Sequence, residues 1–135
     1  GDAGDVNVVV SGAVIVDGFS PSPSGTQGAS GIGSQVFPEG SGKGGSLDLR
    51  SGSLTVTNGG QLTSGTFGAG DAGNIKVFVQ GTATFDGTYL NGASSGAFSA
   101  VAPGARGRGG NIELTADNLT LTNGAGLAAD TAGIG

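Results

Sequence analysis

The chain has 135 residues, of which 31 are glycine and 11% are charged, with a formal net charge of −5 and no Cys, Met, Trp or His. The lack of histidine removes the commonest general base, and the lack of cysteine excludes disulfides and thiolate sites. The acidic balance disfavours nucleic-acid binding, and no apolar run approaches the ~20 residues of a membrane helix. We therefore expect no cofactor, no bound metal, no nucleic-acid partner and no membrane insertion.

A glycine-rich phrase occurs four times along the chain. Its copies are GDAGDV at 1–6, GKGGSL at 42–47, GDAGNI at 70–75 and GRGGNI at 107–112. Repetition at this period indicates stacked units rather than one globule. We expect a single domain with units over 1–42, 43–70, 71–107 and 108–135. Odd units are long and even units short, so the true repeat is a pair of units, 1–70 and 71–135.

Each phrase is followed by apolar residues that alternate with polar ones, the pattern of a half-buried strand. A second short strand follows in every unit, and we expect a third in the even units, carrying Leu62 or Leu127. The residues expected inside are Val6, Val8, Leu47, Leu49, Leu54, Val56, Ile75, Val77, Val79, Ile112, Leu114, Leu119 and Leu121. Asp48, Lys76 and Glu113 should then face outwards.

The second strand of the third unit is ambiguous. Thr82 and Thr84 compete there for the interior with Ala83 and Phe85. We assign Ala83 and Phe85 to the interior, because burying the phenylalanine gains more free energy.

The second strand of each unit ends at Asp-Gly or Asn-Gly, at Asp17, Asn58, Asp86 and Asn123. Three strands and three bends per unit describe one coil of a parallel β-helix, or β-solenoid. Hairpins in a sandwich or propeller are the alternative, because Asn-Gly and Asp-Gly favour type I′ turns. All four units have the same order of phrase, strand, turn and strand along the chain. This repetition favours the β-helix, an all-β fold of about four coils.

The odd units also contain long segments, 19–42 and 88–107, which we expect to be loops. They occupy the same position in alternate units, so they should bulge from the same side of the stack. Contacts between them are expected through Val36 and Val101 or through Phe37 and Phe98, which are also the candidate surface-contact residues.

A polar position in the phrase should form a structural ladder. Asn74 and Asn111 align there with Ser46 and Asp5. In stacked units such side chains lie one above another and can form hydrogen bonds from unit to unit.

Catalytic and ligand motifs are weak. The G-x-G-x-x-G at 68–73 opens a strand rather than the helix that a dinucleotide site requires. Acidic residues lie near turns, where stacking could gather carboxylates for Ca²⁺, but the G-G-x-G-x-D pattern is absent. The few basic residues are scattered, and no convergent acid–base pair follows from the spacing. We expect no enzyme, although a polysaccharide lyase or hydrolase on a β-helix remains a further alternative.

Several segments together resemble the tandem repeats of filamentous-haemagglutinin-like exoproteins, especially long cyanobacterial ones exported by two-partner secretion. These segments are 70–75, 85–87, 95–105, 107–112 and 119–125. The resemblance covers the whole chain and implies a right-handed parallel β-helix, a secreted or cell-surface location and export through a partner outer-membrane β-barrel. It also implies a role as a surface adhesin or extracellular filament, and it implies no catalytic or ligand residues.

The expected function is therefore a structural stalk or filament in cell-surface or matrix attachment. Neither terminal unit is atypical, and 131–135 matches 66–70. Uncapped ends recruit further strands, so the expected partners are further copies of the repeat, covalent or head to tail. The alternative is a carbohydrate- or receptor-binding module that uses segments 19–42 and 88–107, with a surface polysaccharide as a candidate ligand.

Overall fold

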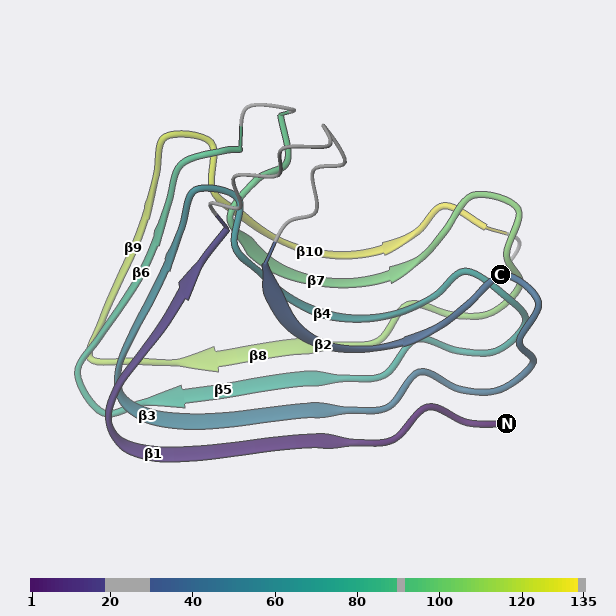
Figure 1. Ribbon diagram of the computed structural model, residues 1–135, viewed down its shortest axis with the longest axis horizontal. Coiled ribbons are helices and arrows are strands. Elements are labelled where there is room, and N and C mark those ends of the chain that lie inside the picture. The colour runs from purple at the N-terminus through teal and green to yellow at the C-terminus, as the bar shows by residue number, and fades with distance from the viewer. Residues whose placement is uncertain (19–29, 90–91, 134–135) are drawn as a thin grey trace, which may run out of the picture.

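The computed structural model describes residues 1–18, 30–89 and 92–133, and this part of the chain is all-β (Figure 1). Its strands are β1 (Val6–Asp17), β2 (Gly31–Val36), β3 (Leu47–Thr57), β4 (Gln61–Thr66), β5 (Ile75–Val79), β6 (Thr82–Asp86), β7 (Gly96–Val101), β8 (Ile112–Thr115), β9 (Asn118–Thr122) and β10 (Gly126–Thr131). Strands such as β5 and β6 show the two-residue alternation of the sequence in their burial, because successive side chains of a strand point to opposite faces.

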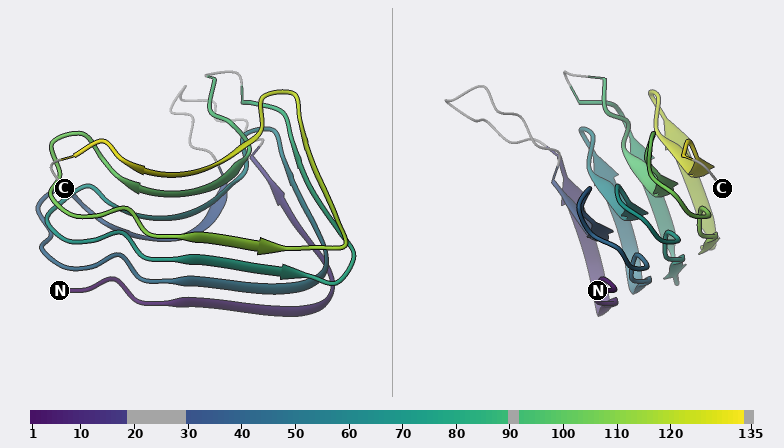
Figure 2. Two further views of the ribbon diagram at one scale, coloured as in Figure 1. Left: turned by 180° about the vertical axis from the view of Figure 1, so that it is seen from behind. Right: turned by 90° about the vertical axis from the view of Figure 1, so that its right-hand side faces the viewer.

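These strands form two parallel sheets. The larger sheet has six strands in the order β8-β5-β3-β6-β9, with β1 paired to β3, and it curls into a half-barrel. The smaller sheet has four strands in the order β10-β7-β4-β2. Every pairing between these strands is parallel and joins one repeat unit to the next, as in Leu47 opposite Ile75. The four units therefore lie as successive layers from the N-terminal to the C-terminal end (Figure 2).

The expected right-handed parallel β-helix, or solenoid, of about four coils is wrong. The structure has two parallel sheets rather than coils of separate strands. In the first two units the first and second expected strands merge into β1 and β3, because their pairing breaks at Gly12 and Gly52 and resumes directly after them. A register shift between Val10 and Ala13 marks this break. The continuous strands β1 and β3 make one curled sheet where two separate faces were expected.

The long odd-unit segments are also not simply loops. Each contains a strand of the smaller sheet, β2 in 19–42 and β7 in 88–107, and both strands pair with β4 of the short unit between them. A third strand is therefore present in every unit. Residues 19–29 and 90–91 lie outside the described residues, so the expectation that these segments bulge from one side stays a prediction there.

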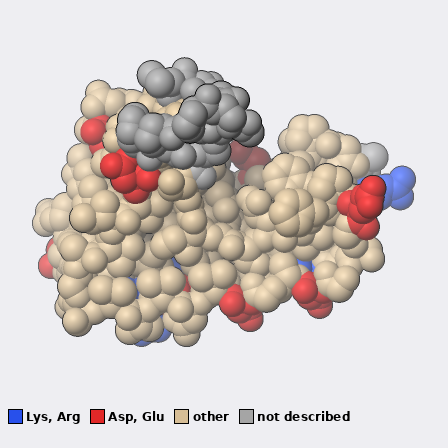
Figure 3. All heavy atoms as spheres, in the orientation of Figure 1, with Lys and Arg blue, Asp and Glu red and all other residues tan. Residues whose placement is uncertain are grey.

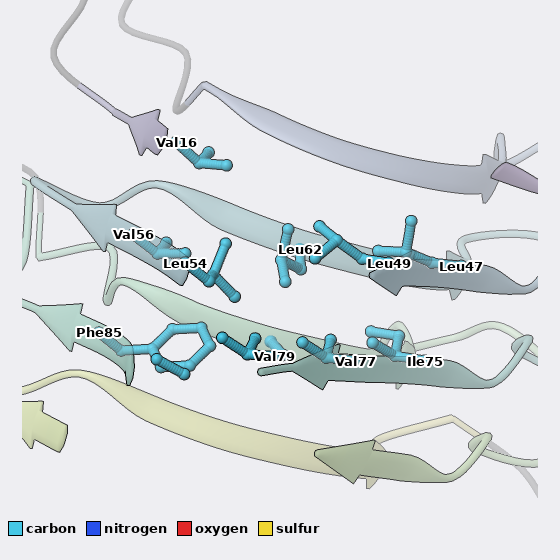
Figure 4. Close-up of a cluster of buried hydrophobic side chains, with 12 residues drawn as sticks. Val16, Leu47, Leu49, Leu54, Val56, Leu62, Ile75, Val77, Val79 and Phe85 are labelled. Atoms are coloured by element: carbon cyan, nitrogen blue, oxygen red, sulfur yellow. The ribbon is translucent and has the colours of Figure 1, made fainter. Parts of the chain in front are cut away.

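The core fills the space between the facing sheets (Figure 4). Leu49, Leu54, Val56, Leu62 and Phe85 are all fully buried. The remaining buried apolar side chains of this cluster are Val16, Leu47, Ile75, Val77, Val79, Ala83 and Ala97. Burial of Ala83 and Phe85 confirms their assignment to the interior, and exposure of Lys76 and Glu113 confirms the outward positions.

Some apolar side chains that were predicted to be buried are partly exposed in the first and last layers of the stack. Leu119 and Leu121 of β9 are 44% and 39% exposed, although they occupy the same positions as the buried Ala83 and Phe85. Val6 and Ile112 are only partly buried against the core. The prediction that Leu119 and Leu121 are buried is wrong, because β9 is an edge strand among the described residues and pairs only with β6.

Candidate functional site

A column of serines on the inner face of the smaller sheet binds the phrase glycines. Ser34 Oγ donates to the Gly4 carbonyl oxygen (2.7 Å), and Ser64 Oγ donates to that of Gly45 (2.7 Å). Ser99 Oγ donates to the Gly73 oxygen at 2.9 Å. The serines are buried, so these bonds satisfy polar groups away from water.

Sequence reasoning missed this serine column. Its only signal is a serine in the third strand of each of the first three units, and alternation alone predicts that such a serine interrupts the core. The fourth unit has Ala129 at this position, opposite Ser99 in the strand register.

The predicted ladder residues lie together in two pairs. The backbone N–H of Ser46 donates to Asp5 Oδ1 (2.7 Å), and the backbone N–H of Asn111 donates to Asn74 Oδ1 (2.9 Å). In both pairs the side chain of the odd unit accepts a bond from the backbone of the following even unit. In these bonds a backbone N–H donates to a side-chain oxygen, whereas bonds between side chains were expected.

The second residue of the phrase repeats this arrangement with charge. Asp2 Oδ1 accepts from the backbone N–H of Lys43 (2.8 Å), and Asp71 Oδ1 accepts from that of Arg108 (2.9 Å). Adjacent backbone bonds keep these residues in one column, as with the Gly44 N–H and the Asp71 carbonyl oxygen at 2.8 Å. The column runs acid, base, acid, base along the stack.

At the Asp-Gly and Asn-Gly turns, too, a side chain of an odd unit accepts a hydrogen bond from the following even unit. Asn58 Nδ2 donates to Asp17 Oδ1 at 3.0 Å, and Asn123 Nδ2 donates to Asp86 Oδ1 at 2.7 Å. Asp86 Oδ1 also accepts from Thr122 Oγ1 at 2.6 Å. The Thr122 and Asn123 hydrogen bonds lower the pKa of Asp86, because they favour its charged form. Asn58 and Asn123 have positive φ values of 52° and 53°, a conformation that asparagine tolerates better than most residues.

These bonds distinguish two kinds of joint between units. We call the joints between units one and two and between units three and four the odd-to-even joints. Each of them has a phrase carboxylate, a ladder residue and a turn aspartate that accept from the following unit. The even-to-odd joint lies between units two and three, where backbone bonds alone, such as Leu47 N–H to the Asn74 carbonyl (2.8 Å), join the phrases. The side-chain bond at its turn has the opposite sense, because Ser95 Oγ of the odd unit accepts from the Gly59 N–H of the preceding even unit at 2.9 Å. The repeat of two units seen in the sequence thus corresponds to an alternation in how the units are joined.

The two ends of the stack are open. At the C-terminal face, formed by β8, β9 and β10, a hollow of about 350 Å³ is lined by Ile112, Leu114, Leu119, Leu127, Ala128 and Ala129. At the N-terminal face, formed by β1 and β2, partly buried Val6, Val8, Val14 and Ile32 pack on the core. Both faces present strand edges next to apolar side chains.

Two adjoining hollows of about 760 and 330 Å³ border the outer face of the smaller sheet, and the larger one extends past the edge of β2 to Ala3 and Gly4. Gln35, Gln61 and Thr63 line both hollows. Phe37 and Phe67, which are 75% and 46% exposed, line one hollow each. None of the described lining residues is charged, in keeping with the sparse charge on the surface in Figure 3.

The four candidate surface-contact residues separate into two pairs. Phe37 is exposed and Phe98 partly exposed, both beside the hollows on the outer face. Val36 and Val101 are buried, at 5% and 0% exposure, because the alternation of β2 and β7 turns them inwards. The expectation of contact through Val36 and Val101 at the surface is wrong. Each instead lies opposite Thr66 of β4, on either side of that strand.

The described residues contain no group of three His, Cys, Asp or Glu side chains placed to hold a metal ion. The ion pair between Arg50 and Asp48 (3.5 Å) lies on the exposed outer face of β3. Within the same described ranges, no helix is long and apolar enough to cross a membrane.

Comparison with known proteins gives no relative. The chain matches no protein-family model, no curated protein and no solved structure.

Proposed function

We propose that this chain is a structural segment of an extracellular stalk or filament, built by stacking further units of its own repeat. The two-unit alternation of side-chain bonds at the joints carries this proposal, because it serves only to order one unit on the next. The parallel pairing of strands from each unit to the next gives further support, since every internal layer is joined to its neighbours in this one way.

The resemblance to filamentous-haemagglutinin-like repeats supplies the biological setting of the proposal. The chain would then belong to a secreted surface adhesin that is exported through a partner outer-membrane β-barrel and mediates attachment to cells or matrix. A stalk requires length and stiffness rather than an active site, and successive parallel layers add about 4.8 Å each.

Tandem fusions of one, two and four copies of the 135-residue chain test the stalk. Small-angle scattering should give a length that rises linearly with copy number, by roughly 19 Å for the four layers of each copy, at constant cross-section. A length that rises much more slowly, as expected for separate globules collapsing on a flexible chain, would overturn the proposal.

The outer face of the smaller sheet favours a second candidate function, binding of an uncharged surface polysaccharide. Exposed Phe37 and Phe67 can stack on sugar rings, while the amides of Gln35 and Gln61 can form hydrogen bonds to hydroxyl groups. Binding of the parent chain to neutral glycans, lost in Phe67→Ala and retained in Thr55→Ala on the other sheet, would support it. Equal binding by both variants would remove this face as the site.

A further inference from the structure

We propose that Asn58 is a latent deamidation site that the joint between units two and three protects, and that its conversion to aspartate loosens the joint between units one and two. This inference goes beyond the proposed function, because it concerns the chemical durability of the stack. Asn58 precedes Gly59 at an exposed turn. An asparagine followed by glycine is especially open to this reaction, since glycine has no side chain to hinder the approach of its own backbone nitrogen.

The reaction needs only this turn and water. The backbone nitrogen of Gly59 loses its proton and attacks Cγ of Asn58, and the side-chain nitrogen leaves as ammonia. Water then opens the cyclic imide and gives aspartate or isoaspartate at this position. The reaction therefore requires a Gly59 N–H that is free to ionise and a nitrogen that can approach the Asn58 side chain.

In the structure the Gly59 N–H is already bonded and buried. It donates to Ser95 Oγ at 2.9 Å, and Gly59 is buried although Asn58 is exposed. A Cβ on Gly59 would lie only 2.5 Å from the Cβ of buried Tyr89, so this backbone packs directly against the tyrosine. Breaking the bond to Ser95 leaves a buried donor without a partner, which costs free energy. The Gly59 nitrogen is thereby kept from the Asn58 side chain.

Ser95 is itself held in place by the turn of its own unit. Its hydroxyl donates to the Asp86 carbonyl oxygen at 2.7 Å, and its backbone N–H donates to the Gly87 carbonyl oxygen at 3.0 Å. Ser95 is fully buried. These residues all belong to unit three, so unit three supplies the protection of a turn in unit two.

Conversion of Asn58 would remove a bond at the other joint of unit two. Asn58 Nδ2 donates to Asp17 Oδ1 at 3.0 Å across the joint between units one and two. Deamidation replaces this donor with a carboxylate, so two like charges face each other where a hydrogen bond was. An intact joint between units two and three thus preserves the joint between units one and two.

Ageing of the whole chain at mildly alkaline pH, followed by peptide mass spectrometry, tests the protection. Trypsin cuts after Arg50 and Lys76, so Asn58 lies in the peptide 51–76, where fragmentation locates the modified residue. Asn58 of the folded chain should deamidate at least about tenfold more slowly than in urea, because the reaction then requires local opening. Ser95→Ala should raise the rate in the folded chain by about three- to tenfold, as expected for the loss of one hydrogen bond. Equal rates in the folded and unfolded parent would overturn the protection.

Ser64→Ala is the matched control. It also removes a buried serine hydroxyl that donates to a backbone carbonyl, at Gly45, but this serine forms no hydrogen bond to an asparagine–glycine turn. The control should leave Asn58 at the parent rate, and urea denaturation of both variants measures what each costs in stability. Equal acceleration of Asn58 by both variants would overturn the role of Ser95.

Hydrogen exchange decides the question if Ser95→Ala fails to fold. The Gly59 N–H of the parent chain should exchange slowly with deuterium, because it is buried and bonded. Exchange as fast as in an unstructured peptide would overturn the protection.

Asn58→Asp tests the consequence of deamidation. At neutral pH it should lower the urea midpoint more than Asn111→Asp does. The control adds the same charge at an exposed asparagine whose side chain forms no hydrogen bond in the described part of the chain. Equal losses from the two variants would overturn the coupling between the joints.

Discussion

Asp86 Oδ1 accepts a 2.7 Å hydrogen bond from Nδ2 of Asn123, which lies at the equivalent turn of the next unit. Thr122 Oγ1 donates to the same oxygen at 2.6 Å. One carboxylate thus joins units three and four at the surface, and its lowered pKa connects this joint to pH.

The pH dependence of stability should follow from this carboxylate. The pKa of Asp86 in the folded chain lies below its ordinary value of 3.8, so its contribution is fully present above pH 3.8. The contribution is lost as the pH falls through the folded pKa, where the carboxylate becomes protonated. Asp86→Asn should flatten the dependence of the urea midpoint on pH in this acid range. The control is Asp117→Asn, because it removes the same charge and Asp117 has no side-chain hydrogen bond in the described part of the chain. This variant should leave the Asp86 contribution in place. Equal flattening by both variants would contradict the assignment.

Two buried serines should respond in opposite ways to removal of the hydroxyl. Ser51 Oγ is the one buried side-chain polar atom without a hydrogen-bond partner among the described residues, whereas Ser64 Oγ donates to the Gly45 carbonyl. Ser51→Ala should stabilise the chain by about 1 kcal/mol, because the unpaired hydroxyl is costly to bury. Ser64→Ala should destabilise it by about 1–3 kcal/mol. Chemical denaturation of both variants measures the pair, and destabilisation by Ser51→Ala would show that its hydroxyl has a partner.

Position in the stack should decide the cost of shortening a leucine. Leu54 and Leu119 occupy the same position in the second and fourth units, but their exposures are 0% and 44%. Leu54→Ala should lower the free energy of unfolding by about 2–5 kcal/mol, the range for a buried leucine. Leu119→Ala should cost clearly less in dilute solution, measured by urea denaturation. Equal costs at low concentration would mean that β9 is already covered.

A close backbone approach should make Gly70 irreplaceable. Its φ is +137°, and a Cβ there would collide with the Gly42 carbonyl oxygen of the preceding unit. Gly70→Ala should therefore destabilise the chain well beyond the ~1 kcal/mol typical of a glycine change. Gly12→Ala is the control, because nothing lies within 4 Å of the added Cβ. Thermal unfolding should separate the two variants, and similar melting temperatures would show that the phrase column can relax.

The sequence by itself determined which side chains of each strand face inwards. The two-residue alternation is a local property of the chain, so Ala83 and Phe85 could be placed inside and Lys76 outside. It also determined that the four glycine-rich phrases recur and that long and short units alternate, because both patterns are visible in the sequence.

Only the tertiary structure decided how the strands join and which positions are covered. Whether a strand ends at Gly52 or resumes directly after it depends on the neighbouring strands. Here it resumes, so β3 is one continuous strand and the expected coil was wrong. The exposure of Leu119 and the bond from Ser34 to the Gly4 carbonyl likewise depend on residues of other strands or layers. The alternation along one strand contains no information about the layers above and below it. Burial and hydrogen bonding in a stack depend on those layers, so the sequence pattern alone could not predict them.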